Sequence, residues 1–155
     1  MVLSLSLLTA CKSGADDGDE NYVPPMGEFT LPTTDTAAEN TVDYVVATLS
    51  EKFTIRDFYQ MRYELIGAKD GAAIRVNGVT MEIYQFDKEN EFFKEIATLG
   101  AYPIKNDEGK VLKTTEAYVN GSFVLVVSRN TNDANEDITE KNQKVVKVFQ
   151  QMKLA

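Results

Sequence analysis

Two segments rich in apolar residues meet at Asn77–Gly78, and a similar pair of segments meets at Asn120–Gly121. An Asn-Gly pair in this setting is typical of a two-residue hairpin turn, because both turn residues adopt a positive φ. The pattern therefore predicts two β-hairpins. Residues 123–127 are apolar at every position, which is typical of a central strand that is covered on both faces. In the first hairpin, the positions expected to face each other are Val76 and Val79, Ile74 and Met81, and Ala72 and Ile83.

Helical periodicity is present before, between and after the two hairpins. Apolar residues recur every three or four positions over residues 42–53, and the preceding Thr36–Glu39 segment has the spacing of a capping box. A second helix is predicted over residues 87–99 with Asp87 as its N-cap, and a third from about Asp137. The sequence thus predicts an α+β fold: a mainly antiparallel sheet from two ββα units, packed with an N-terminal, a middle and a C-terminal helix.

Two stretches have weaker patterns. Residues 53–56 are predicted to be extended, and a short helix is predicted to begin at Asp57 and to end at Gly67. Residues 101–113 are predicted to form a loop with one turn at Asn106–Gly109.

Negative charge is concentrated near the start of the sequence. Residues 12–43 hold eight acidic residues and one lysine, whereas the rest of the chain holds 16 acidic and 15 basic residues. Residues 12–36 also contain three of the four prolines, so this segment is predicted to be a disordered acidic tether. We therefore expect a separate N-terminal segment at residues 1–11, the tether at 12–36 and a single α+β domain at 37–155. No basic patch stands out, which argues against a nucleic-acid partner.

The composition also restricts the chemistry. The chain has no His, no Trp and one Cys, so it lacks the commonest acid–base catalyst, an internal disulfide and a thiolate zinc site. A calcium-loop spacing that starts at Asp17 lacks the central Gly, and we expect neither a metal nor another cofactor. The carboxylates Asp70, Glu82 and Asp87 lie near hairpin ends, but no pattern brings them together, and we do not predict an enzyme.

A short apolar run over residues 2–8 ends in Leu8–Thr9–Ala10–Cys11. This ending resembles a bacterial lipobox, which implies that Cys11 is lipidated on its sulfur and becomes the mature N-terminus. Lipoproteins of this kind also begin with Lys or Arg ahead of the apolar run, and residues 1–10 contain neither. The alternative interpretation is an ordinary N-terminal strand with a buried cysteine.

The segments around Val76–Asn77–Gly78, Glu82–Asp87 and Asn120–Leu125, together with the lipobox, resemble small extracytoplasmic lipoproteins of Gram-positive, clostridium-like bacteria. The resemblance implies a location, lipid-anchored on the extracytoplasmic face of the cell membrane, and a fold. It implies no catalytic residue.

These observations favour a binding or interaction module that is tethered to the membrane through its N-terminal lipid and has a protein or peptide partner. The expected binding face consists of Tyr84, Phe86, Tyr118 and Phe123. One alternative is a peptidase-inhibiting or chaperone-like lipoprotein that receives a peptide strand at the edge of its sheet. The other alternative is a hydrolase that uses carboxylates.

Overall fold

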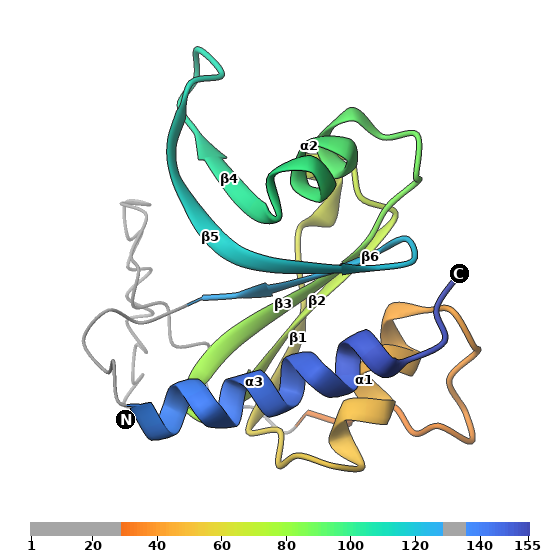
Figure 1. The fold of residues 1–155 in the computed structure, drawn as a ribbon. Helices are drawn as coiled ribbons and strands as arrows, with labels where there is room; N and C mark the ends of the chain where they lie inside the picture. The colour runs from red at the N-terminus through yellow and green to blue at the C-terminus, as the bar shows by residue number, and fades with distance from the viewer. Residues whose placement is uncertain (1–28, 129–135) are drawn as a thin grey trace, which may run out of the picture.

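The computed structural model describes residues 29–128 and 136–155, which form a six-stranded antiparallel sheet with helices on both faces (Figure 1). The strand order is β1-β2-β3-β6-β5-β4. The α+β class and the antiparallel sheet predicted from the sequence are confirmed. The elements are α1 (Val42–Ser50), β1 (Asp57–Gln60), the 3-10 helix η1 (Tyr63–Ile66), β2 (Asp70–Val76), β3 (Val79–Gln85), α2 (Glu91–Leu99), β4 (Ala101–Lys105), β5 (Val111–Asn120), β6 (Phe123–Val127) and α3 (Glu136–Gln151).

The first hairpin joins β2 to β3 through Asn77 and Gly78, whose φ angles are 55° and 77°. These two positive angles give the backbone a turn that matches the right-handed twist of the strands. The register across the hairpin pairs Val76 with Val79, Ile74 with Met81 and Ala72 with Ile83.

The second hairpin turns one residue later than Asn120–Gly121. Asn120 is the last residue of β5 and pairs with Phe123, so the two turn residues are Gly121 and Ser122. Gly121 has a φ of 59°, whereas Asn120 has a negative φ. A turn of this kind needs its positive φ at the first turn residue, and here that residue is Gly121. The Asn120 side chain instead contacts the end of α3. Its Nδ2 donates hydrogen bonds to the carbonyl oxygens of Phe149 and Met152, at 2.7 and 2.9 Å.

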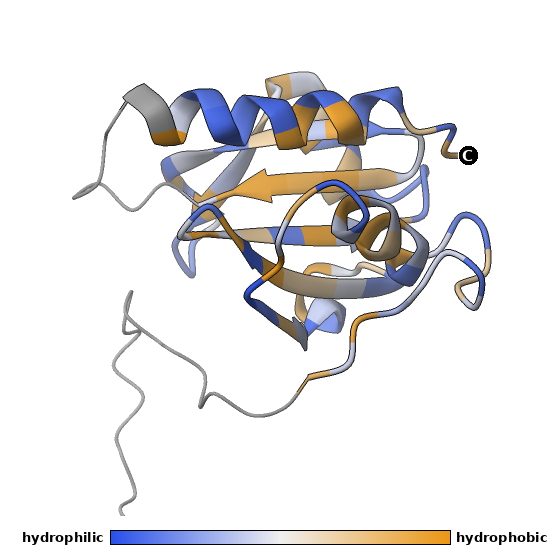
Figure 2. Cartoon of the chain, turned by 90° about the horizontal axis from the view of Figure 1, so that it is seen from below, coloured by the Kyte–Doolittle hydropathy of each residue, from blue (hydrophilic) through white to orange (hydrophobic). Residues whose placement is uncertain are grey.

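One face of the sheet is covered by α1 and α3 together (Figure 1). Hydrophilic and hydrophobic segments alternate along α3 (Figure 2), and its Val145 and Phe149 are fully buried. They pack with apolar side chains of β3 and β6, which include Met81 and Phe123, while Tyr118 is partly buried at the margin of this core. β6 lies between β3 and β5, so its uniformly apolar sequence does belong to a central strand.

The opposite face is covered by α2, by η1 and by the β4–β5 hairpin. β5 is bent, so that its first half and β4 stand over this face beside α2 (Figure 1). The buried residues of this second core include Tyr84, Phe86, Phe93 and Ile96, together with Val124 and Val126 of β6.

The predicted starts of α1 and α2 are wrong by several residues. The N-cap of α1 is Thr41, whose Oγ1 accepts a hydrogen bond from the Tyr44 N–H at 3.2 Å, whereas the Thr36 hydroxyl donates to the Thr33 carbonyl. The N-cap of α2 is Asn90, while Asp87 accepts the Glu89 N–H in a turn that precedes the helix. In both cases the sequence offers more than one polar residue ahead of the helix, and the one next to the first buried turn forms the cap.

Two segments predicted to be helix or loop are edge strands. Residues 57–60 pair with β2, and residues 101–105 pair with β5, with a register shift between Ile104 and Lys105. Pro103 and Lys105 interrupt the pattern typical of a strand, so residues 101–105 resemble a loop. Proline and lysine are nevertheless frequent in edge strands. The turn predicted at residues 106–109 is present and closes the β4–β5 hairpin, where the Gly109 N–H donates to the Asn106 carbonyl.

The predicted tether ends before residue 36. Leu31 packs against the core that α1 covers, and residues 33–36 form a turn in which the Thr36 N–H donates to the Thr33 carbonyl. Thr34 also donates a hydrogen bond to Glu51, one residue beyond α1. The remainder of the predicted tether, the signal segment with Cys11, and the polar segment at 129–135 lie outside the described residues.

Candidate functional site

An open groove of about 610 Å³ lies on the face of the sheet that α2 covers. Residues from η1, β3, α2 and β4 line it, and the alternation of β3 brings Glu82 and Tyr84 to the same side. We call it the α2-side groove. Its lining includes Glu82, Tyr84, Phe92, Tyr102, Lys105 and Leu65.

The two β3 side chains in the groove contact each other. The Tyr84 hydroxyl donates a hydrogen bond of 2.8 Å to Glu82 Oε2. Burial raises the pKa of Glu82, and the hydrogen bond from Tyr84 partly opposes that shift. Burial also raises the pKa of Tyr84, and the nearby Glu82 carboxylate raises it further. Near neutral pH the Tyr84 hydroxyl therefore stays protonated and acts as a hydrogen-bond donor.

The Tyr84 ring is positioned by a glycine on the neighbouring strand. Gly71 is directly opposite Tyr84 in the β2–β3 register. A Cβ atom at Gly71 would lie 2.7 Å from Cδ1 of the Tyr84 ring and 2.9 Å from Cβ of Tyr63 in η1. Only a glycine therefore lets the ring and η1 approach β2 this closely.

Aromatic side chains from three elements contact one another in and beside the groove. The Tyr84 and Tyr102 rings are stacked with their centroids 6.3 Å apart, and Phe92 meets Tyr102 edge-on at 5.3 Å. Burial, and secondarily the Glu82 charge, raise the pKa of Tyr102 to about 12. The groove thus presents apolar rings beside two tyrosine hydroxyls that stay protonated under physiological conditions.

A single asparagine connects the two segments that flank the groove. Asn90 Oδ1 accepts the Phe93 N–H at 3.0 Å and so caps α2, while its Nδ2 donates to the Gly67 carbonyl at 3.1 Å. Gly67 ends η1 with a φ of 72°. Because Leu65 lies in η1 and Phe92 in α2, this side chain sets the distance between two sides of the groove.

The charges in the groove are not balanced. Lys105 pairs with Glu95 at 2.5 Å, and its Nζ lies 5.8 Å from the centre of the Phe92 ring. Within residues 29–128 and 136–155, by contrast, no Lys or Arg forms an ion pair with Glu82. The groove therefore carries a carboxylate whose charge has no cationic partner in the described chain.

The structure does not bring the four residues of the expected binding face together. Tyr84 and Phe86 belong to the core under α2, whereas Tyr118 and Phe123 belong to the core under α1 and α3. Phe86 and Phe123 are almost fully buried, at 1% and 0% exposure, so an open aromatic face is wrong. The sequence prediction grouped them by ring type, although the period of two along β3 and β5 separates the faces. Of the four, Tyr84 lines the groove.

The sequence prediction missed Glu82, Phe92 and Tyr102 as partners in one site. Glu82 and Tyr84 are two positions apart on a strand, a spacing that the sequence does show. Tyr102 was hidden by the assignment of its segment to a loop. The other two carboxylates considered for catalysis do not join them, since neither Asp70 nor Asp87 lines the groove, and Asp87 pairs with Lys69 at 3.5 Å.

In the described parts of the chain, no group of three or more acidic or thiol side chains is arranged to hold a metal ion. No helix there is both long enough and apolar enough to cross a membrane. Comparison with known proteins gives no match: no family model, no curated protein and no solved structure matches this chain.

Proposed function

We propose that this protein is an extracytoplasmic, lipid-anchored lipoprotein whose folded domain binds a small ligand in the α2-side groove. The observation that carries the binding site is the groove itself, whose volume of about 610 Å³ is within the range of small-molecule sites. Its lining combines aromatic side chains with a few polar groups, which is the usual composition of a ligand pocket.

The geometry of the groove favours binding over catalysis. Glu82 is the one carboxylate among the described residues that line it, and its near neighbours are tyrosines with raised pKa values. Protonated tyrosines donate hydrogen bonds, but they are poor bases at neutral pH. These groups are suited to orienting a ligand rather than to moving protons.

The membrane anchor is supported by the sequence. The diacylglyceryl group that the lipobox implies at Cys11 would supply two acyl chains, which is what stable anchoring requires. Expression in a Gram-positive host, with a Lys/Arg-bearing start placed ahead of Met1, should give a membrane-bound, processed protein. Cys11→Ala should give an unprocessed precursor, and Ser13→Ala serves as the control. Processing of the Cys11→Ala variant to the same extent as the parent would disprove the anchor.

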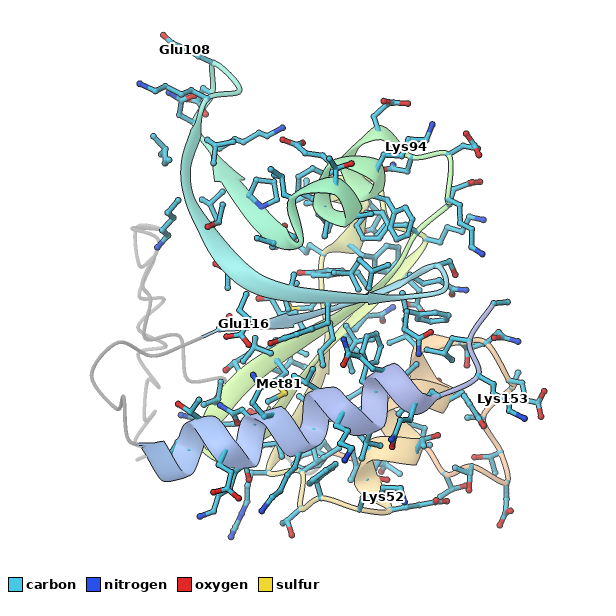
Figure 3. The ribbon with its side chains drawn as sticks, in the orientation of Figure 1. Lys52, Met81, Lys94, Glu108, Glu116 and Lys153 are labelled. Carbon is cyan, nitrogen blue, oxygen red and sulfur yellow. The ribbon has the colours of Figure 1, made fainter. Side chains whose placement is uncertain are left out.

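The binding function can be tested without knowing the natural ligand. Amide resonances of the ¹⁵N-labelled full chain are followed by NMR while neutral aromatic probes, 2-phenylethanol and indole, are added. We expect shifts at groove residues, among them Tyr102 and Val126, and none at the far end of the β4–β5 hairpin, where Figure 3 places Glu108. Shifts that are spread evenly over the surface would contradict a specific site.

The alternative of a peptide strand added to the sheet edge receives less support. One edge strand, β1, has four residues, and the other, β4, contains Pro103, which removes one backbone donor. Within the same proposal, we interpret β2–β3–α2 and β5–β6–α3 as the two ββα units, with β1 and β4 as additional edge strands.

A further inference from the structure

We propose that the α2-side groove takes a small organic cation, an alkyl- or arylammonium group, with the cationic head at Glu82 and the apolar body against the aromatic wall. This inference rests on the proposed binding function and specifies the chemical class of its ligand.

One carboxylate oxygen of Glu82, Oε1, receives no hydrogen bond from the described chain. The Tyr84 hydroxyl occupies Oε2, and no other hydrogen bond to Glu82 is made by the described chain. No fully buried side-chain oxygen in the described residues lacks a hydrogen-bond partner, so Oε1 is at least partly exposed, and Glu82 lines the groove. A carboxylate accepts about four hydrogen bonds, which leaves room for an ammonium group with its three donors.

The negative charge of Glu82 has no positive partner among the described residues. A partly buried carboxylate is unfavourable unless a positive group lies close to it. Lys105, the one cation among the described residues that line the groove, is already paired with Glu95 at 2.5 Å. The positive charge that balances Glu82 therefore comes from outside the described chain, and in this proposal a cationic ligand provides it.

The groove also offers an apolar surface for the body of the ligand. Phe92 and Tyr102 form an aromatic wall in the groove that Glu82 also lines, and the Lys105 Nζ lies 5.8 Å from the centre of the Phe92 ring, at cation–π distance. Leu65 is 81% exposed at the rim, although it is a large apolar side chain. A ligand that covers Leu65 and these rings would bury apolar surface while its head contacts Glu82.

A metal ion fits the groove less well than an organic cation. Calcium takes six to eight oxygen ligands and magnesium about six. Glu82 is the one carboxylate that the described chain places in the groove, and tyrosine hydroxyls with raised pKa values are poor ligands for such ions.

The experiment compares two probes of the same shape that differ in charge. The full chain is titrated with phenethylammonium and with 2-phenylethanol at pH 7, and dissociation constants are obtained from the NMR shifts of groove amides. We expect the ammonium to bind on the order of tenfold more tightly, which corresponds to about 1.4 kcal/mol for one partly screened ion pair. In Glu82→Gln the two probes should bind equally, because the carboxamide still accepts the Tyr84 hydrogen bond but carries no charge.

The control is Glu108→Gln, which removes the same charge at the tip of the β4–β5 hairpin, far from the groove (Figure 3). It should retain the preference for the ammonium probe, and thermal melts establish that both variants are folded. Equal binding of the two probes to the parent protein would overturn the cation inference and leave the binding function standing. Groove amides that respond to neither probe would overturn both.

Discussion

Gly121 lies directly against Ala155. A Cβ atom at Gly121 would be 2.5 Å from the Ala155 carbonyl oxygen, and the N–H of the neighbouring Ser122 donates to that same oxygen at 2.8 Å. The Ala155 N–H in turn donates to Asn40 Oδ1 at 2.8 Å. The segment after α3 is thus held between the second hairpin turn and the residues that precede α1.

This contact predicts that valine is tolerated less well at Gly121 than at Gly78. Both glycines have a positive φ, which strains a β-branched residue by about 1–3 kcal/mol. A Cβ atom at Gly78 would meet no atom within 4 Å beyond the two adjacent residues, so Gly78→Val should lower the free energy of unfolding by that strain alone. Gly121→Val should lower it by at least about 1 kcal/mol more, because the side chain also displaces Ala155. Urea denaturation measures both values.

Removal of residues 154–155 separates the two causes. In the shortened chain the clash is absent, so the additional loss caused by Gly121→Val should disappear while the backbone strain remains. An unchanged difference between the two valine variants in the shortened chain would contradict the contact as its cause.

The neighbouring Asn120 provides the second prediction. Its Nδ2 donates to the carbonyls of Phe149 and Met152 at the end of α3, where carbonyl groups carry partial negative charge. Asn120→Asp keeps the shape of the side chain but places a carboxylate against two acceptors. We expect it to lower the free energy of unfolding by about 2–4 kcal/mol, more than Asn120→Ala at about 1–2 kcal/mol. An aspartate variant as stable as the alanine variant would show that these hydrogen bonds contribute little.

The third prediction concerns the glycine that positions Tyr84. Gly71→Ala introduces a methyl group 2.7 Å from the Tyr84 ring, so we expect about 1–3 kcal/mol of destabilisation and displacement of the ring from the groove. The near-ultraviolet circular dichroism of the tyrosines and the NMR shifts of groove amides report the displacement.

A double-mutant cycle supplies the control for Gly71. Tyr84→Phe keeps the ring and should leave the effect of Gly71→Ala unchanged. Tyr84→Ala removes the ring and should reduce it. An effect of equal size in all three backgrounds would mean that Tyr63, rather than Tyr84, opposes the methyl group.

The sheet could be predicted from the sequence where its strands pack on both sides and not where they lie at its edges. Residues 123–127 are apolar throughout because the strand is covered on both faces, and this pattern correctly placed β6 in the centre. The edge strands β1 and β4 are short, and β4 carries Pro103, so neither has a periodic signal that differs from a loop.

The site was harder to predict because it depends on the curvature of β5. Glu82 and Tyr84 are separated from Tyr102 by α2, and the bend of β5 carries β4 back over the sheet. Sequence periodicity gives the face of each residue but not the bend of a strand. The same limitation explains why Tyr118 and Phe123 were grouped with Tyr84 and Phe86, although they lie on the other side of the sheet.

The last prediction follows from the pKa of Glu82. Burial raises it above the ordinary value of 4.5, and the Tyr84 hydrogen bond opposes this shift, while the Glu82 charge in turn raises the pKa of Tyr102. Because the folded pKa exceeds the unfolded one, the stability that protonated Glu82 contributes is fully present below about pH 4.5 and is lost as the pH rises through the folded pKa. At pH 7 the charged carboxylate therefore destabilises the fold in the absence of a cation.

Glu82→Gln should consequently melt higher than the parent protein at pH 7, by on the order of a few degrees, and at nearly the same temperature at pH 3.5. Glu108→Gln, which removes an exposed charge, should change the melting temperature little at either pH. Addition of phenethylammonium at pH 7 should raise the melting temperature of the parent and not that of Glu82→Gln, because only the parent has the charge to bind it. A Glu82→Gln variant that melts lower than the parent at pH 7 would mean that the Glu82 carboxylate stabilises the fold. The carboxylate would then have a structural role, and the groove would not hold its charge for a ligand.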